Sequence, residues 1–217
     1  MSIRRRTAHR RRAGDQRLRF DENGTFQISV FSDLHFAEGT ITDLNHCLGI
    51  LTIFKDDEED HKTTGVMRSV LSSEEAQLVV LNGDLISGEA TQSSNSTLYV
   101  DRVVAPLVDL DLPWASTYGN HDSEINLDPK ELFRRETEYR NSLTQRDILD
   151  PAAGITNYYL PIFPHGASND SIPVFILWFF DSQGGHYPLT ENDDGKATKR
   201  QNWVDDTVST TALMNHA

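Results

Sequence analysis

Apolar and polar residues divide the chain into short blocks that predict strands and helices in alternation. Runs rich in apolar, β-branched and aromatic residues predict strands, because such side chains suit a buried pleated surface. Apolar residues spaced three and four apart between these runs predict helices. The expected strands cover residues 26–31, 78–81, 113–118, 158–163 and 174–180.

The helical spacing begins after the first expected strand and recurs between the later ones. In the second helix, Val66, Val70 and Leu71 are expected to share one face. Asp128 and Pro129 predict the N-cap and the first residue of the fourth helix. The expected helices cover residues 41–54, 66–76, 98–108 with an interruption near Pro106, 128–141, and 199–208.

Strands and helices that alternate in this way predict an α/β fold, in which parallel strands are joined by crossover helices. Three of the strands are each followed at once by polar residues. Because the carboxyl ends of parallel strands meet at one edge of a sheet, we expect these polar clusters to lie together. The clusters are Asp33-Leu34-His35, Gly83-Asp84 and Gly119-Asn120-His121-Asp122.

These clusters contain the side chains that bind metal ions. Carboxylate and amide oxygens with imidazole nitrogens suit Mn, Fe, Zn or similar ions. The alternative is three unrelated turns, in which Asn and Asp bond to the local backbone. The ordered occurrence of all three clusters, each directly after an apolar strand, favours a metal site.

Charge is unevenly distributed along the 217 residues. Residues 1–19 hold eight Arg and one Asp, whereas the rest carries a net charge of −20 within a total of −13. We interpret residues 1–24 as a disordered basic arm, with a targeting or nucleic-acid tail as the alternative. The acidic run 56–62 is interpreted as a solvated loop. An acidic body makes nucleic acid an unfavourable partner.

Two further features bear on the cellular setting. No apolar run approaches the roughly 20 residues of a membrane helix, so no membrane partner is expected. Cys47 is the one cysteine, which excludes a disulfide within the chain, and the N-terminus has no apolar signal region. We therefore expect a cytoplasmic protein.

The three clusters and their flanking residues resemble those of the calcineurin-like metallophosphoesterases. Within that family they are most similar to the fungal cell-cycle phosphatases and to the related short purple-acid-phosphatase-like proteins. The resemblance extends from Phe26 to the C-terminus. It implies that residues 25–217 form the N-terminal part of an α/β/β/α sandwich with mostly parallel strands and crossover helices.

The resemblance also implies a role for each cluster residue. Asp33 and His35 would bind one metal ion, Asp84 would bridge two, and Asn120 would bind the second. The cofactors would be two divalent or mixed-valence ions of Fe, Mn or Zn, with a hydroxide bridging them as the nucleophile. The same family pattern has two further positions that act on the substrate: His121 would stabilise or protonate the phosphate ester, and Asp122 would orient His121.

The implied activity is hydrolysis of phosphate monoesters, with phosphoproteins among the candidate substrates. Two departures from the family pattern qualify this expectation. Ser87 stands where purple acid phosphatases have a metal-binding tyrosine, so no tyrosinate-coloured iron is expected. The chain also lacks the family's later Gly-His and Gly-His-x-His segments, so we expect a C-terminally truncated domain. The alternatives are an inactive fragment that binds a metal or a partner, and a phosphodiesterase.

Overall fold

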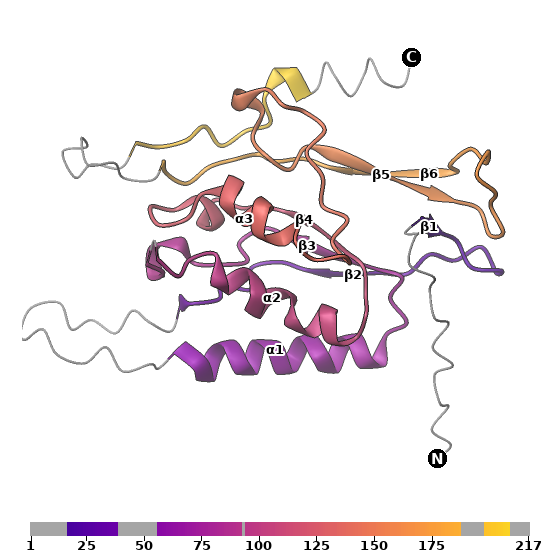
Figure 1. The fold of residues 1–217 in the computed structure, drawn as a ribbon, viewed down its shortest axis with the longest axis horizontal. Coiled ribbons are helices and arrows are strands. Elements are labelled where there is room, and N and C mark those ends of the chain that lie inside the picture. Colours follow the sequence, from indigo (N-terminus) through magenta and orange to yellow (C-terminus); the bar gives the residue numbers. More distant parts are fainter. Residues whose placement is uncertain (1–16, 39–55, 93, 188–197, 209–217) are drawn as a thin grey trace, which may run out of the picture.

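Two three-stranded sheets form the centre of this computed structural model, which describes residues 17–38, 56–92, 94–187 and 198–208 (Figure 1). The first sheet is parallel throughout and has the order β2-β3-β4. The second has the order β1-β5-β6, with β1 parallel to β5 and β5 antiparallel to β6. The strands are β1 (Leu18–Arg19), β2 (Ile28–Phe31), β3 (Leu78–Asn82), β4 (Trp114–Thr117), β5 (Tyr158–Phe163) and β6 (Phe175–Phe179).

Three helices cover one face of the β2-β3-β4 sheet, and the second sheet covers the other (Figure 1). Alternation along β3 produces this layering: Val79 and Leu81 pack with the helices, whereas Leu78 and Val80 pack with β1, β5 and β6. The helices are α1 (Asp56–Ser73), α2 (Leu98–Asp109) and α3 (Pro129–Glu136). The expected α/β class is therefore confirmed, with three layers among the described residues.

Helix α1 corrects two expectations. The acidic run at 56–62, expected to be a loop, forms its first turns. Acidic side chains suit the positive end of the helix dipole, and Glu58 pairs with Lys62 at 2.9 Å. The buried face is also different from the expected one. Met67 lies on it beside Leu71, whereas Val66 is 62% exposed.

The remaining differences concern the boundaries of elements. Helix α3 ends at Glu136 rather than near residue 141, and α2 continues through Pro106. Residues 199–205 are not helical, although 206–208 are. The helix expected over 41–54 lies outside the described residues.

The arm expected to be disordered over residues 1–24 has structure in its described part. Leu18 and Arg19 form β1 and pair with Ile162 and Phe163. Leu18 is 4% exposed in the core between the sheets, and this apolar contact explains why the basic segment becomes ordered there. No helix among the described residues is both long and apolar enough to cross a membrane.

Candidate metal centre

Each predicted cluster follows the carboxyl end of a strand in the parallel sheet. Register pairs Phe31 with Leu81 and Leu81 with Ser116, so β2, β3 and β4 end near one another. The backbone of the segments beyond them continues this pairing. Asp33 donates its N–H to the carbonyl of Gly83 at 3.0 Å, and Gly83 donates to the carbonyl of Thr117 at 3.1 Å. The sheet therefore brings the three clusters to one edge.

At this edge, His35, Asp84 and His121 form a cluster with the geometry of a metal site. One ligand atom from each lies within 4.8 Å of the others, and all three residues are half-buried. The two imidazole rings meet edge to face with their centroids 4.8 Å apart. Two imidazoles and a carboxylate are suitable ligands for Zn, Fe or Mn ions. The donor set therefore fits the metals that the sequence motifs imply.

Three predicted ligands have backbone conformations that side-chain-bearing residues seldom adopt. The φ angles of Asp33, His35 and Asp84 are 53°, 48° and 50°. Conformations of this kind cost on the order of 1–3 kcal/mol each and tend to cluster at functional sites. Gly119 lies against Asp84 so closely that a Cβ atom there would overlap the Asp84 carboxylate. The tight turns thus place these side chains at a cost in backbone energy.

Asp122 links two of the loops from beneath the site. Its fully buried carboxylate accepts backbone N–H groups from Leu85 at 3.0 Å, Ile86 at 2.9 Å and Gly119 at 2.8 Å. Burial raises the pKa of Asp122 to about 7, although the three N–H groups favour the ionised form. These hydrogen bonds hold loop backbone, and among the described residues none joins the Asp122 carboxylate to the imidazole of His121. The expected role of Asp122 in orienting His121 stays a prediction.

Glu89 contacts the imidazole of His121, a contact that the sequence motifs did not predict. His121 Nδ1 lies 2.8 Å from Glu89 Oε1, and the backbone N–H of His121 donates to Asp84 Oδ1 at 3.0 Å. Burial opposes a charged imidazole, but the negative charges of Glu89, Asp84 and Glu124 outweigh it and raise the pKa of His121. The contact joins residues 32 positions apart.

The structure places the other two predicted ligands differently. Asp33 is exposed, its carboxylate accepts the Ser32 hydroxyl at 2.6 Å, and it is not part of the cluster of three. Asn120 is also exposed and directly precedes His121 in the chain. Gly184 packs so closely on Asn120 that an added Cβ would lie 2.9 Å from the Asn120 Cβ. The ligand roles of Asp33 and Asn120 stay predictions.

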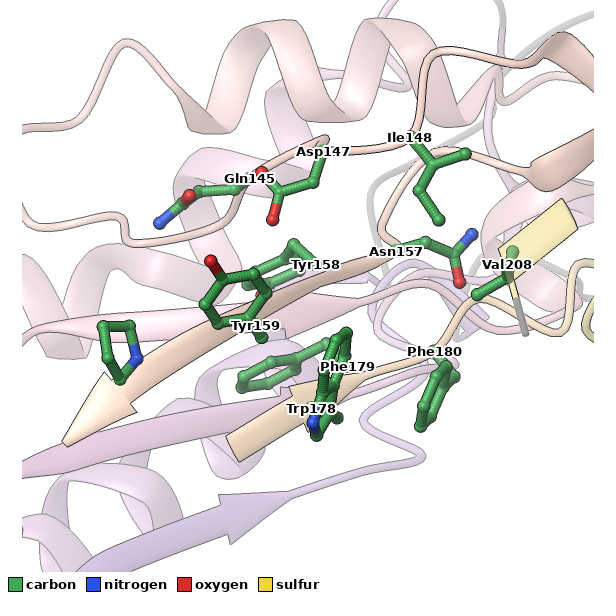
Figure 2. A pocket seen from close by; sticks show the side chains of 11 residues that line it. Gln145, Asp147, Ile148, Asn157, Tyr158, Tyr159, Trp178, Phe179, Phe180 and Val208 are labelled. Atoms are coloured by element: carbon green, nitrogen blue, oxygen red, sulfur yellow. The ribbon is translucent and has the colours of Figure 1, made fainter. Parts of the chain in front are cut away.

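A separate hollow of about 470 Å³ lies on the β5-β6 side of the molecule (Figure 2). Its wall is aromatic: the Tyr159 and Trp178 ring centroids are 5.1 Å apart, and Trp178 stacks on Phe180. Asp147 adds a carboxyl group, whose pKa is raised by burial. None of the residues of the metal cluster lines this hollow, so the candidate chemistry belongs to the sheet edge and not to the aromatic wall.

The three ordered clusters at the carboxyl ends of parallel strands are the pattern of the metallophosphoesterase class. Residues 26–217 match the profile of the calcineurin-like phosphoesterases, and the chain therefore belongs to this family. The resemblance found in the sequence motifs is thus confirmed.

Two curated relatives are similar over most of this chain. The "Probable inactive purple acid phosphatase 29" of Arabidopsis thaliana is 32% identical over 93% of this chain and 50% of its own length. The "Phosphatase DCR2" of Saccharomyces cerevisiae is 33% identical over 78% of this chain and 28% of its own length. A crystal structure of a dimetal phosphatase from Danio rerio aligns with a TM-score of 0.42 and 17% identity, covering 78% of this chain and 48% of that one. The chain spans half or less of the length of these proteins.

Proposed function

We propose that this chain carries the site of a metal-dependent phosphatase that hydrolyses phosphate monoesters, including those of phosphoproteins. The observation that supports this most directly is the cluster of His35, Asp84 and His121 at the strand ends of a family member. Two bound ions of Fe, Mn or Zn would neutralise the phosphate oxygens and activate water for in-line attack. His35 and Asp84 of this cluster would hold these ions, and His121 would face the phosphate ester.

Side chains and loops of this chain would bind the metal ions, donate a proton and hold the site in place. Metal would be bound by four side chains, those of Asp33, His35, Asp84 and Asn120. His121, whose raised pKa favours a protonated imidazole, would offer a proton to the leaving oxygen. Asp122 would hold the loops through their backbone N–H groups. This division makes His121 the residue that touches the substrate and Asp122 a positioning residue.

Hydrolysis of an aryl phosphate in the presence of Mn²⁺ tests the proposal. We expect turnover that falls by about 100-fold or more in Asp84→Asn, because a bridging ligand is lost. Asp170→Asn, at an exposed turn, is the matched control and should keep its activity. Absence of turnover both in this chain and in a form extended to the relatives' length would contradict a phosphatase function.

A second candidate is a non-catalytic phosphoesterase domain that binds metal without hydrolysis. The Arabidopsis relative named above supports it, because its name describes it as probably inactive. Zn²⁺ binding that depends on Asp84, together with absent turnover in the extended form, is the expected result for this candidate. Turnover by the 217-residue chain that Asp84→Asn abolishes would exclude it.

A further inference from the structure

The segment from Ser87 to Glu89 contacts both histidines of the metal cluster. Ser87 Oγ lies 2.9 Å from His35 Nδ1, and Glu89 Oε1 lies 2.8 Å from His121 Nδ1. We propose that Ser87 and Glu89 are positioning residues that, together with Glu38, keep a proton on Nδ1 of both rings and leave Nε2 for the metal ion or the phosphate. The inference rests on the proposed function only for what Nε2 then binds.

Glu89 determines the proton position on His121 through simple hydrogen-bond chemistry. An ionised carboxylate only accepts hydrogen bonds, so the imidazole nitrogen facing it must be the donor. In neutral His121 the proton therefore stays on Nδ1, and Nε2 carries the lone pair. In charged His121 the same contact leaves the Nε2 proton free to be donated. Either way, Glu89 occupies Nδ1, and Nε2 is the nitrogen that this contact leaves available.

The Ser87 hydroxyl alone does not determine which nitrogen of His35 carries the proton, because a hydroxyl can both donate and accept a hydrogen bond. A second contact is needed. Glu38 supplies it: a carboxylate oxygen of Glu38 lies 3.9 Å from His35 Nδ1. This negative charge favours a proton on Nδ1, which then donates to the Ser87 hydroxyl. Within the described part of the chain, hydrogen bonds and ion pairs reach the Nδ1 of His35 and of His121 and no Nε2 atom.

The backbone fixes this segment between the loops that carry the two histidines. Ser87 donates its N–H to the carbonyl of Phe36, next to His35, at 2.9 Å. Gly88 lies on the other loop: an added Cβ there would be 2.9 Å from the carbonyl oxygen of His121. Ser87 itself is 1% exposed. A segment held on both sides in this way can orient both rings at once.

Two-bond ¹H–¹⁵N correlation spectra of the metal-free chain test the proposal directly. They distinguish the Nδ1–H from the Nε2–H form of a neutral imidazole, at a pH well above the usual histidine pKa of about 6.5. We expect the Nδ1–H form for His35 and His121, with signals assigned from His35→Asn and His121→Asn. An Nε2–H form for either ring in the unmodified chain would overturn the proposal without any variant.

Two variants separate the two contacts. Glu89→Gln should change the His121 ring to a mixture of forms and leave His35 unchanged, because an amide can donate as well as accept. Ser87→Ala should release His35 and weaken Zn²⁺ binding by about 10–100-fold, the usual effect of losing such a partner. Glu75→Gln and Ser72→Ala change exposed residues of the same types and should alter neither measurement.

The outcomes are separable from those of the phosphatase assay. Unchanged ring forms and unchanged Zn²⁺ affinity in both variants would overturn the positioning role, even in an active phosphatase. Nδ1–H rings in a protein without turnover would instead support the positioning role and count against the proposed activity. If Ser87→Ala fails to fold, the spectrum of the unmodified chain and that of Glu89→Gln decide the question.

Discussion

Two buried carboxylates near β4 hold their surroundings in opposite ways. Asp122 is 0% exposed and accepts only backbone N–H groups, from the loops after β3 and β4. Glu136 is 2% exposed and accepts side-chain donors from β4, from the residue that follows β4, and from the segment after α3. The donors to Glu136 are Trp114, Ser116, Tyr118, Ser142 and Thr144.

The difference corresponds to whether the side chains of each region are predicted to bind a ligand. At the site, Asp122 fixes the loops through their backbone, so the side chains of His121 and Asp84 remain available for chemistry. Around Glu136 no side chain is a predicted metal ligand, and five side chains donate hydrogen bonds to the Glu136 carboxylate. The sheet edge that carries the metal cluster therefore depends on backbone geometry, whereas the region around Glu136 depends on the identity of its side chains.

The largest expected effect on stability comes from removing the Glu136 carboxylate. Glu136→Ala should lower the free energy of unfolding by about 3–5 kcal/mol, because it leaves several buried donors without an acceptor. Urea unfolding measures the loss. Glu22→Ala, at an exposed position, should cost less than about 0.5 kcal/mol. A loss below about 1 kcal/mol for Glu136→Ala would show that the side-chain network contributes little.

Asp122→Asn should have the next largest effect. Near pH 5 the Asp122 carboxyl is protonated because its pKa is raised to about 7, but both of its oxygens can still accept N–H groups. The amide of Asn keeps one acceptor oxygen and turns an N–H group toward a backbone donor, so we expect a loss of about 3 kcal/mol at that pH. Zn²⁺ affinity should fall in the same variant because both loops are released. Normal Zn²⁺ affinity in a destabilised Asp122→Asn protein would contradict the assigned role as a backbone clamp.

The pH dependence of the free energy of unfolding, measured on the metal-free protein, further distinguishes Asp122 from Glu136. The pKa of Asp122 is raised from 3.8 to about 7 in the folded protein, so its contribution to stability is complete below 3.8 and is lost as the pH rises through 7. The penalty of Asp122→Asn should therefore shrink by about 2 kcal/mol between about pH 5 and about pH 8. Urea unfolding at several pH values checks this. A stability penalty that grows with pH would show that the backbone N–H groups lower the pKa of Asp122 by more than burial raises it.

Single donors to Glu136 should give the smallest effects. Tyr118→Phe removes the hydroxyl that bonds Glu136 Oε2 at 2.8 Å and should cost about 1.5 kcal/mol. Ser142→Ala removes a longer bond of 3.2 Å to the crowded Oε1 and should cost less than about 0.5 kcal/mol. Thermal unfolding of the two variants compares them. Equal losses of stability in the two variants would show that the hydrogen bonds to Oε1 and to Oε2 contribute the same free energy.

Local pattern was sufficient to predict the parallel strands and the place of the clusters. Apolar runs mark β3 and β5, and the polar residues that follow β3 mark the sheet edge. The family motif also indicated His35, Asp84 and His121, which the structure brings together. These features follow from short-range periodicity and from the geometry of parallel strands.

Features that depend on distant contacts could not be predicted in this way. Asp60 lies in an acidic run typical of a solvated loop, yet it is buried in α1 beside Arg102 at 3.0 Å. Glu89 reaches His121 only because the turns of Gly88–Ala90 and His121–Ser123 pack together. Neither contact leaves a signal in residue spacing, because the partner depends on tertiary packing.

The three tryptophans provide optical probes of separate parts of the molecule. Trp114 is fully buried and bonded to Glu136, Trp178 lines the aromatic hollow (Figure 2), and Trp203 is 60% exposed. Indole emission depends on the polarity of its surroundings, so each ring reports on a different region. Single-tryptophan variants would thus record whether the sheet that carries the metal cluster and the sheet with the aromatic wall lose their structure together or one after the other.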